Sequence, residues 1–337
     1  MAELRCCVIG CTSNWYQKVH HPSLRRLDGR VRLVAAASRN AEGRERITGE
    51  LGFERAYADI DEMLDAERPD YVVICVGHEY TPTMACKVLD RSIPVLMEKP
   101  VGKHPADGRR VLAAVERADV PNLVAFNRRH NPLLVRARRL AAERGGVSQY
   151  IGEWMRHDVK APRAIMGSAL HMIDALRFLG GDVEAFSGAG SATRYFDEAL
   201  VASSFHLRFA GGAVGTFSHN VRAGRACERY RIHAENWTAT VSVPPPGRFD
   251  DRWWMTIEED DRLVEQTTIA HLKKEQRNAL WTQGFRQEHE HFVDCLESGE
   301  PPRPDVAEAL RSMELADRLL RTVAPPEQID EPGRDQG

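Results

Sequence analysis

Glu98, Lys99 and Pro100 follow directly after a short apolar run, residues 95–97, whose composition predicts a buried strand. The carboxyl end of such a strand is where open α/β sheets bind their ligands. An ammonium group there could donate a hydrogen bond to a hydroxyl or carbonyl oxygen and change the proton affinity of that oxygen. The same residues could instead form a surface ion pair between Glu98 and Lys99. The elements around them must decide between these two interpretations.

Short apolar runs alternate with amphipathic stretches over the first 127 residues. The run at 71–76 is almost entirely apolar and largely β-branched, which is typical of a central parallel strand covered on both faces. Further strands are expected at 5–10, 31–38, 95–98 and 122–127, and helices at 14–27, 41–51, 81–90 and 106–117. This alternation predicts an α/β Rossmann domain over residues 1–127, with a doubly wound parallel sheet.

Beyond residue 127 the strand-like runs follow one another with few helices between them. We expect strands at 149–155, 201–209, 213–218, 228–234, 238–243 and 253–258, with helices at 132–144, 168–179, 284–296 and 306–323. Gly211 and Gly212 mark a hairpin turn. The pattern predicts a C-terminal α+β domain over residues 128–323 with a large open, mostly antiparallel sheet. The Pro-, Asp-, Glu- and Gly-rich segment 324–337 is expected to be a disordered tail.

Composition limits the classes of protein to consider. A chain of 337 residues suits two domains, at roughly 150 residues each. The net charge of −3 gives no electrostatic reason to expect nucleic acid or an anionic membrane as a partner. The N-terminus enters a strand-like segment at once, which leaves no room for a signal peptide. We therefore expect a cytoplasmic protein whose seven cysteines are buried free thiols.

Gly10 ends the first expected strand, where a dinucleotide-binding loop would begin. The full fingerprint, G-x-G-x-x-G/A, needs two more small residues, but Thr12 and Trp15 occupy those positions. Thr12, Ser13 and Asn14 could still cap a helix and donate hydrogen bonds to a phosphate. The alternative is an ordinary turn between a strand and a helix.

Ser38 and Arg39 end the second expected strand, where NAD-binding domains carry an acidic residue for the ribose 2′-hydroxyl. A serine and an arginine instead suit a 2′-phosphate, and the guanidinium group could also lie over adenine. The alternative is a solvated arginine at the start of a helix. We predict NADP as the cofactor, with NAD as the second choice.

Taken in order, these features resemble the Gfo/Idh/MocA oxidoreductases, which include glucose–fructose oxidoreductase and inositol dehydrogenase. The resemblance runs from residue 5 to about residue 322 and rests on the segments 8–10, 21–24, 38–39, 97–100, 126–132, 171–174 and 288–294. It implies an N-terminal Rossmann domain and a C-terminal α/β domain. The open sheet of the second domain commonly forms the oligomer interface in this family, so a homo-oligomer is implied.

The resemblance also assigns roles to residues. Lys99 matches the lysine that contacts both the nicotinamide ribose and the reacting substrate oxygen. Pro100 matches a proline usually preceded by a cis peptide. His171 matches the histidine that exchanges the substrate proton, a role that suits imidazole because it titrates near neutrality. The alternative for His171 is a histidine packed at a helix start beside Met172 and Ile173.

Two sets of residues are therefore expected to form the site. The cofactor set is Gly10, Thr12, Ser13, Asn14, Ser38, Arg39, Val76, Glu98, Lys99, Pro100 and Asn127. The substrate set is Lys99, Arg128, Arg156, Lys160, Arg163 and His171, whose basic groups would suit a polyol or an acidic or phosphorylated sugar.

One position departs from the family pattern. Gly167 stands four residues before His171, where family members commonly carry an aspartate. Asp174 could face His171 from the next turn, although a pairing with Arg177 on the same helix is the expected use. Asp158 is another candidate for the missing carboxylate.

No metal site is expected. His289 and His291 lie among glutamates, but side chains at i and i+2 do not share a helix face. The pair Trp253-Trp254 is expected to pack in the core or at an interface rather than to stack on a sugar.

Three functions remain to be weighed. The first is an NAD(P)-dependent oxidoreductase that moves hydride to or from a secondary alcohol or ketone of a sugar, cyclitol or related compound. The second is a cofactor-binding protein with little redox turnover, which Thr12, Trp15 and Gly167 favour. The third is an enzyme that holds NAD tightly and uses transient oxidation for elimination or glycoside cleavage.

Overall fold

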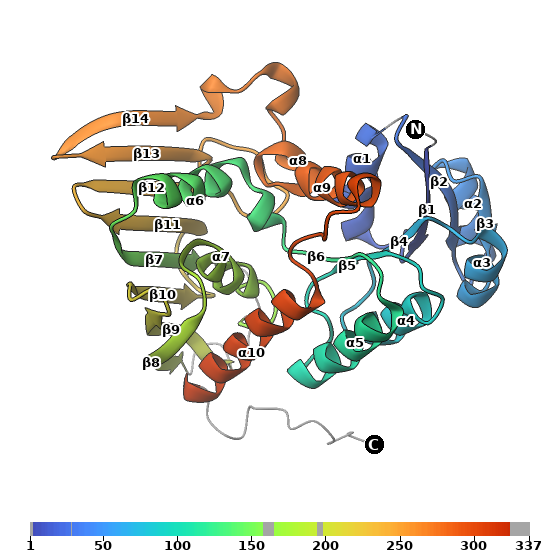
Figure 1. Cartoon of the computed structure of the whole chain (residues 1–337), viewed down its shortest axis with the longest axis horizontal. Helices are drawn as coiled ribbons and strands as arrows, with labels where there is room; N and C mark the ends of the chain where they lie inside the picture. The colour runs from blue at the N-terminus through green and yellow to red at the C-terminus, as the bar shows by residue number, and fades with distance from the viewer. Residues whose placement is uncertain (1–2, 28, 158–164, 194–197, 324–337) are drawn as a thin grey trace. The chain divides into compact units, whose positions relative to one another are not determined.

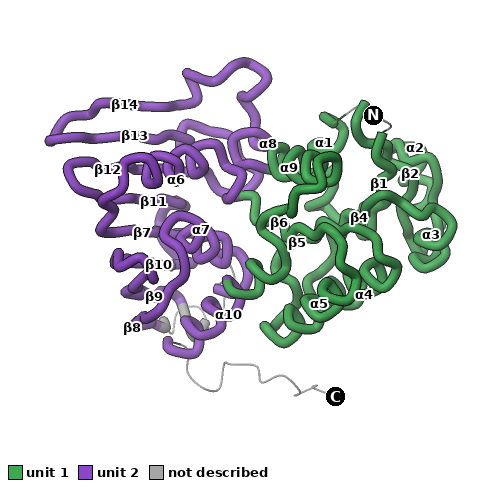
Figure 2. Tube along the Cα trace, in the orientation of Figure 1, with its two compact units in different colours: residues 1–127, 285–311 green, residues 128–284, 312–337 purple. Residues whose placement is uncertain are grey.

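The structure is a computed structural model that describes residues 3–27, 29–157, 165–193 and 198–323 (Figure 1). The chain forms two compact units, which Figure 2 shows in different colours. Unit 1 comprises residues 1–127 and 285–311, and unit 2 comprises residues 128–284 and 312–337. The expected tail at 324–337 lies outside the described residues.

A six-stranded parallel sheet forms the centre of unit 1, in the order β3-β2-β1-β4-β5-β6. Its strands are β1 (Leu4–Ile9), β2 (Val31–Ala37), β3 (Arg55–Tyr57), β4 (Tyr71–Ile74), β5 (Val95–Glu98) and β6 (Asn122–Ala125). The four residues of β4 are all buried, as expected of a central strand covered on both faces. The predicted doubly wound parallel sheet is confirmed.

Helices connect these strands. The run after β1 combines a π-helical segment (Tyr16–His20), α1 (His21–Leu24) and a 3₁₀ turn (Arg25–Leu27). The others are α2 (Ala41–Gly49), α3 (Ile60–Glu67), α4 (Thr81–Leu89) and α5 (Pro105–Ala118). Asn40 and Asp59 cap α2 and α3, because their side chains accept hydrogen bonds from Gly43 N and Glu62 N.

Helix α9 (Phe285–Ser298) belongs to unit 1, although the sequence analysis placed residues 285–311 in the second domain. Phe292 is fully buried in the unit 1 core and packs edge-on against Tyr71, with ring centroids 5.6 Å apart. Arg30 binds Asp294 at 2.7 Å and Glu297 at 2.6 Å. The apolar face of α9 thus has its partners on the first sheet.

Unit 2 contains an eight-stranded sheet in the order β14-β13-β12-β11-β7-β10-β9-β8. Its strands are β7 (Val147–Met155), β8 (Val183–Thr193), β9 (Glu198–Phe209), β10 (Val214–Asn220), β11 (Cys227–Ala234), β12 (Trp237–Val243), β13 (Trp254–Glu259) and β14 (Arg262–Thr268). Among the described strands of this sheet, only β7 and β10 pair in parallel. The hairpin predicted at Gly211-Gly212 joins β9 to β10, and Gly212 has the positive φ of +87° that favours glycine.

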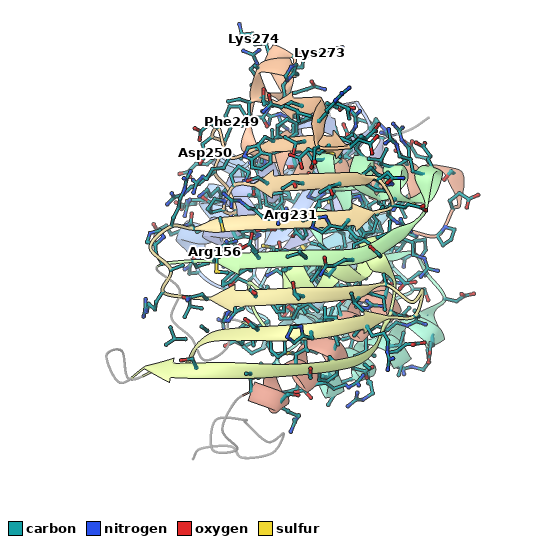
Figure 3. All side chains as sticks on the ribbon, turned by 90° about the vertical axis from the view of Figure 1, so that its left-hand side faces the viewer. Arg156, Arg231, Phe249, Asp250, Lys273 and Lys274 are labelled. Atoms are coloured by element: carbon teal, nitrogen blue, oxygen red, sulfur yellow. The ribbon has the colours of Figure 1, made fainter. Side chains whose placement is uncertain are left out.

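One face of this sheet packs on helices. These are α6 (Pro132–Arg144), α7 (Leu170–Gly180) and the last part of α10 (Val306–Val323), and a short helix, α8 (Ala279–Thr282), precedes α9. A Cβ atom on Gly152 of β7 would lie 2.7 Å from Met172 Sδ and 2.9 Å from Leu176 Cδ1, so a glycine lets α7 approach the sheet closely. Figure 3 looks onto the opposite face, which no described helix covers.

Two further expectations concern the whole chain. All seven cysteines are free thiols, and five of them are buried. Across the described ranges, no helix combines the length and apolar character needed to span a membrane.

Candidate active site

Gly10 brings the ends of β1 and β4 together. It has a φ of +91°, and a Cβ atom there would lie 2.2 Å from Cys75 O and 2.8 Å from Val76 Cγ1. A larger residue would therefore clash with the backbone of the neighbouring strand end. Because β1 lies between β2 and β4, this is the point where the strand order reverses and where doubly wound sheets bind ligands.

The loop after Gly10 turns at once into the first helical segment. Ser13 N donates to Gly10 O at 3.1 Å, and Tyr16 N donates to Ser13 Oγ at 3.2 Å. Thr12 and Asn14 are exposed on this loop. The first amides of a helix have no carbonyl partner one turn earlier, so a polar loop at this edge fits a pyrophosphate.

Trp15 does not fill that loop. Its indole Nε1 donates a 2.6 Å hydrogen bond to Glu98 Oε1, and its ring packs edge-on against Phe285 at 5.6 Å. The third position of the fingerprint therefore connects the loop to the end of β5. The sequence carried no signal for this role.

Ser38 and Arg39 follow β2 at the same edge of the sheet. Asn40 caps α2 by accepting a 2.7 Å hydrogen bond from Gly43 N, and Arg44 Nη1 binds the carbonyls of Ser38 and Arg39, each at 3.0 Å. These contacts fix the backbone and leave the Arg39 side chain exposed. A guanidinium group is therefore accessible at this edge of the sheet.

Glu98 is the centre of a buried network. Its Oε1 contacts His20 Nε2 at 2.8 Å as well as Trp15, and its Oε2 accepts from Lys99 N at 3.1 Å. His20 Nδ1 in turn lies 2.9 Å from Nε2 of His289 on α9. Both histidine side chains are 1% exposed. The sequence analysis assigned no role to His20 and did not connect it with His289, because 269 residues separate the two.

Charge compensation holds this network together. Burial alone would raise the pKa of Glu98, but its hydrogen bond with His20 and the nearby positive charges lower it. Burial alone would lower the pKa of His20, but hydrogen bonds with the Cys75 thiol and the Glu98 carboxylate raise it well above the usual value. A carboxylate and an imidazolium therefore face each other directly behind Lys99.

Lys99 lies at the end of β5 with its side chain half-buried. The peptide bond between Lys99 and Pro100 is cis, as the resemblance implied. Gly10, Val76 and Lys99 thus follow β1, β4 and β5, three adjacent parallel strands, and share one edge of the sheet. Asn127, the last predicted cofactor residue, is buried just after β6.

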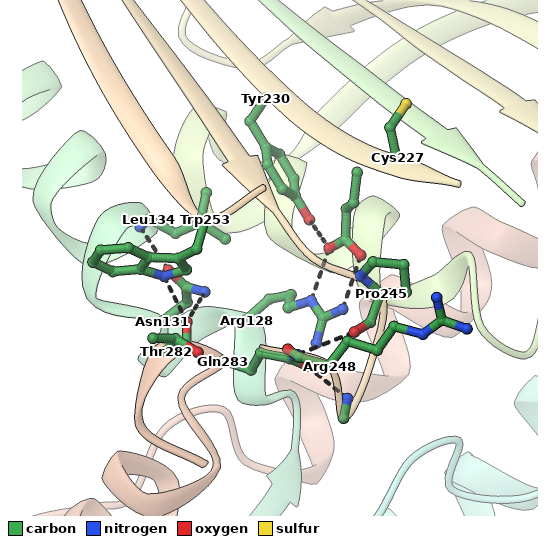
Figure 4. A network of polar contacts seen from close by, with 12 residues as sticks. Arg128, Asn131, Leu134, Cys227, Tyr230, Pro245, Arg248, Trp253, Thr282 and Gln283 are labelled. Carbon is green, nitrogen blue, oxygen red and sulfur yellow. Dashed lines mark hydrogen bonds and ion pairs between the residues drawn. The ribbon is translucent and has the colours of Figure 1, made fainter. Parts of the chain in front are cut away.

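In unit 2 the structure brings Arg128 and Arg156 together on Glu228. Arg128 donates from Nε and Nη2 to the two carboxylate oxygens at 2.7 and 2.8 Å, and Arg156 Nη2 donates to Oε2 at 3.0 Å. Tyr230 adds a hydroxyl donor at 2.7 Å. Figure 4 shows Arg128 and Tyr230 pointing at this carboxylate.

This cluster has a structural role. The Glu228 and Arg128 side chains are 0% exposed, and the Arg156 side chain is 5% exposed. Burial would raise the pKa of Glu228, but the two guanidinium groups lower it to about 2. Arg128 and Arg156 therefore share one buried negative charge, and their predicted contact with substrate stays a prediction.

His171 lies in the first turn of α7 and is 7% exposed. Asp174 was expected to pair with Arg177, but its carboxylate has other partners. Its carboxylate instead binds Arg129 through two 2.8 Å hydrogen bonds and accepts from Ser312 Oγ at 2.7 Å. Arg177 reaches Asp182 and Ser312, so the expected pairing along the helix was wrong. The predicted residues Asp158, Lys160 and Arg163 lie outside the described residues.

The two histidines of α9 have different partners. His289 contacts His20, whereas His291 Nε2 accepts from Arg303 N at 3.0 Å. Among the described residues, no group of three or more His, Cys, Asp or Glu side chains could hold a metal ion. Trp253, which was expected in a core or at an interface, is 1% exposed and donates from Nε1 to Thr282 O at 2.9 Å.

Two family models match this chain. Residues 4–126 match the NAD-binding Rossmann fold of the Gfo/Idh/MocA oxidoreductase family, and residues 135–326 match the C-terminal alpha/beta domain of the same family. D-apiose dehydrogenase of Paraburkholderia graminis is 22% identical, covering 92% of this chain and 85% of that protein. Myo-inositol 2-dehydrogenase of Thermotoga maritima is 23% identical, covering 84% of this chain and 86% of that protein.

Solved structures share the fold across nearly the whole chain. Levoglucosan dehydrogenase in complex with NADH and levoglucosan superposes with a TM-score of 0.80 at 19% identity, covering 95% of this chain and 96% of that one. An oxidoreductase from Agrobacterium radiobacter in complex with NAD+, L-tartaric acid and magnesium gives 0.77 at 16% identity, covering 95% and 96%. The sheet order of unit 1, the mixed sheet of unit 2 and both family matches agree, so this chain belongs to the Gfo/Idh/MocA oxidoreductase family.

Proposed function

We propose that this protein transfers hydride between a bound NAD(P) and a secondary alcohol or ketone of a sugar, cyclitol or related compound. The observation that carries the proposal is the anchoring of Lys99. Its backbone is held by Glu98 at the carboxyl end of β5, on the same sheet edge as the Gly10 loop. Apiose and inositol dehydrogenases among the relatives support this substrate class.

The nicotinamide ring supplies the hydride acceptor or donor when it is bound. The chain's own residues do the rest. The Lys99 ammonium donates a hydrogen bond to the reacting oxygen and stabilises negative charge that develops there. His171 takes the substrate proton as a neutral imidazole and returns it as an imidazolium, and an imidazole side chain can adopt both forms near neutral pH.

Replacement of Lys99 tests the mechanism. Lys99→Met keeps the length of the side chain but removes the charge and the donors, so turnover of sugars and cyclitols should fall by about a thousandfold or more. NADPH affinity, measured by fluorescence titration, should change far less. Wild-type protein that binds NADPH but turns over nothing in a broad panel would favour the cofactor-binding alternative. Cleavage or elimination without net cofactor consumption would favour the third.

We propose NADP as the preferred dinucleotide. The exposed Arg39 side chain, on a backbone fixed by Arg44, supports this preference, because a guanidinium group can bind a 2′-phosphate. Arg39→Ala should weaken NADPH binding by about tenfold or more and NADH binding far less, since only NADPH carries the 2′-phosphate. An equal loss for both dinucleotides, or tighter binding of NADH to the wild type, would contradict this preference.

We further propose that the protein is a homo-oligomer that associates through the open face of the unit 2 sheet. Alternation along β7 leaves Ile151 and Glu153 on that face, half-buried, beside Arg229 and Arg231 of β11. An unpaired, self-complementary surface of mixed charge suits a symmetric interface.

A further inference from the structure

Unit 1 contains a line of hydrogen bonds from α9 to the end of β5. His289 Nε2 lies 2.9 Å from His20 Nδ1, His20 Nε2 lies 2.8 Å from Glu98 Oε1, and Glu98 Oε2 accepts from Lys99 N at 3.1 Å. The two imidazoles meet edge to face, with ring centroids 5.2 Å apart. Neither histidine has a part in hydride transfer as proposed above.

Proton counting restricts the states of this line. Glu98 Oε1 is a carboxylate oxygen, so His20 Nε2 must carry a hydrogen to donate. A single hydrogen lies between His20 Nδ1 and His289 Nε2. It belongs to His289 when His20 is neutral, and to His20 when His20 is an imidazolium. One added proton therefore changes the charge of the pair without breaking either hydrogen bond.

The surroundings favour the charged pair. The titratable and charged groups that face His20 are Glu98 on β5, Cys75 after β4, His289 on α9 and, from the same helical run, Tyr16, whose ring stacks on that of His20 with centroids 6.3 Å apart. The positive charge of Lys99 also lowers the pKa of Glu98. A buried carboxylate without a charged partner is costly. The ionised carboxylate of Glu98 and the protonated His20–His289 pair therefore stabilise each other.

We propose that His20 and His289 are positioning residues, which together hold one proton beside Glu98, keep its carboxylate ionised and fixed, and thereby fix the backbone of Lys99. This inference rests on the proposed function. Because the pKa of His20 is raised, the histidine pair is positively charged at neutral pH, and it loses this charge as the pH rises through the raised pKa of His20. Activity should fall over the same pH range.

Substitution of His289 tests the pair. In His289→Leu, His20 Nδ1–H loses its acceptor, so the pKa of His20 should fall and the basic limb of kcat against pH should move at least about one unit lower. In the same variant kcat near pH 8 should fall by about tenfold or more, because small misplacements of a reacting group are costly. His289→Gln offers a side-chain oxygen to the same hydrogen and should restore both quantities to within about threefold.

His21→Gln is the matched control. It removes an imidazole from the neighbouring position, where His21 Nε2 contacts Leu51 O at 2.9 Å, and it should leave the pH profile unchanged. A basic limb that stays in place in His289→Leu would overturn the inference. So would a glutamine variant no better than the leucine variant.

A second measurement needs no turnover. Spectra of the full chain with ¹⁵N-labelled histidine, with His20 assigned through His20→Gln, should show both His20 nitrogens protonated near pH 7.5. In Glu98→Gln the pKa of His20 should fall. A neutral His20 near pH 7.5 would overturn the inference even if the wild type is an active dehydrogenase. A charged His20 in a protein without turnover would instead count against the proposed function alone.

Discussion

Trp15 illustrates how far a single residue can depart from its place in a motif. By the fingerprint it stands where a small residue lets the helix approach, and it departs from the G-x-G-x-x-G/A pattern. In the structure its indole nitrogen donates to Glu98 and its ring edge packs on Phe285. The side chain leaves the loop and supports the end of β5 instead.

Trp15→Phe should reduce activity through the lost donor. The ring can still pack on Phe285, but Glu98 loses a charge-assisted hydrogen bond, which is worth about 1.5–3 kcal/mol. We expect kcat to fall by about tenfold, since Lys99 is held by the same carboxylate. Steady-state kinetics with urea unfolding measures both effects.

Phe285→Leu is the matched control for that variant. It removes the ring contact, worth about 0.5–1.5 kcal/mol, but leaves the indole donor in place. It should lower stability and change kcat by no more than about twofold. Equal losses of kcat in the two variants would show that packing, and not the hydrogen bond, supports the site.

Residues of the site differed in how far the sequence could predict them. The positions of Lys99 and Gly10 could be predicted because each follows a strand, and parallel strands end at one edge. His20 and His289 could not be paired, since nothing in the sequence brings residues 269 apart into contact. Arg128 and Arg156 were expected as neighbours of substrate, but their shared partner Glu228 was invisible without the register of β7 and β11.

At the scale of elements, strand β11 fixes a buried ion cluster. Its alternation places Glu228 and Tyr230 on the helix-facing side, where Arg128 reaches them from the turn after β6. Removal of one partner from a buried ion pair destabilises the folded protein strongly, because the other charge is left uncompensated.

Acid should therefore weaken the protein through Glu228. Its pKa of about 2 in the folded state lies below its ordinary value of 4.5, so the stabilisation is present above about pH 5 and is lost as pH falls toward 2. The contribution is on the order of 3 kcal/mol. Urea unfolding at several pH values measures it.

Two variants separate the charge from the rest of the cluster. Glu228→Gln should cost about 3–5 kcal/mol near pH 7, and this cost should shrink toward acid, where the wild type has also lost the charge. Tyr230→Phe loses one hydrogen bond, about 1 kcal/mol, and should keep the pH dependence. A constant difference between wild type and Glu228→Gln at every pH would contradict the assignment.

Each element that the sequence analysis missed has a physical reason for its weak signal. Strand β3 has three residues, too few for a periodic signal. Strand β14 is mostly exposed at the sheet edge, so its residues need not alternate. Strand β8 is rich in alanine, glycine and serine, which carry weak strand preference. Helix α3 is short, with eight residues. Helices α6 and α10 were predicted to the residue, and α6 begins at Pro132 and ends before Gly145, two residue types that mark helix ends.

At the scale of the whole molecule, the open sheet face should decide the oligomeric state. Ile151 lies at its centre, between Arg231 of β11 and Thr216 of β10. Ile151→Lys would place like charges against each other across a symmetric interface. We expect its mass in sedimentation to fall to that of one chain, 37.9 kDa.

Val135→Lys is the control for this change. Val135 is 45% exposed on α6, which packs on the other side of the sheet, so the same new charge there should leave the mass of the wild type unchanged. A wild type that sediments as a single chain would remove the proposed interface. An unchanged mass in Ile151→Lys would move it to another surface.

Residues 285–311 belong to unit 1 although they follow almost all of unit 2 in the sequence, and this order affects folding during synthesis. A ribosome delivers the six parallel strands first, but Phe292 and His289 emerge only after almost the whole second unit. Until then Tyr71 lacks the ring of Phe292, and His20 Nδ1 lacks the imidazole of His289. The first unit therefore stays incomplete while the second is synthesised. Fragments that stop at residue 127 should be captured by chaperones or degraded.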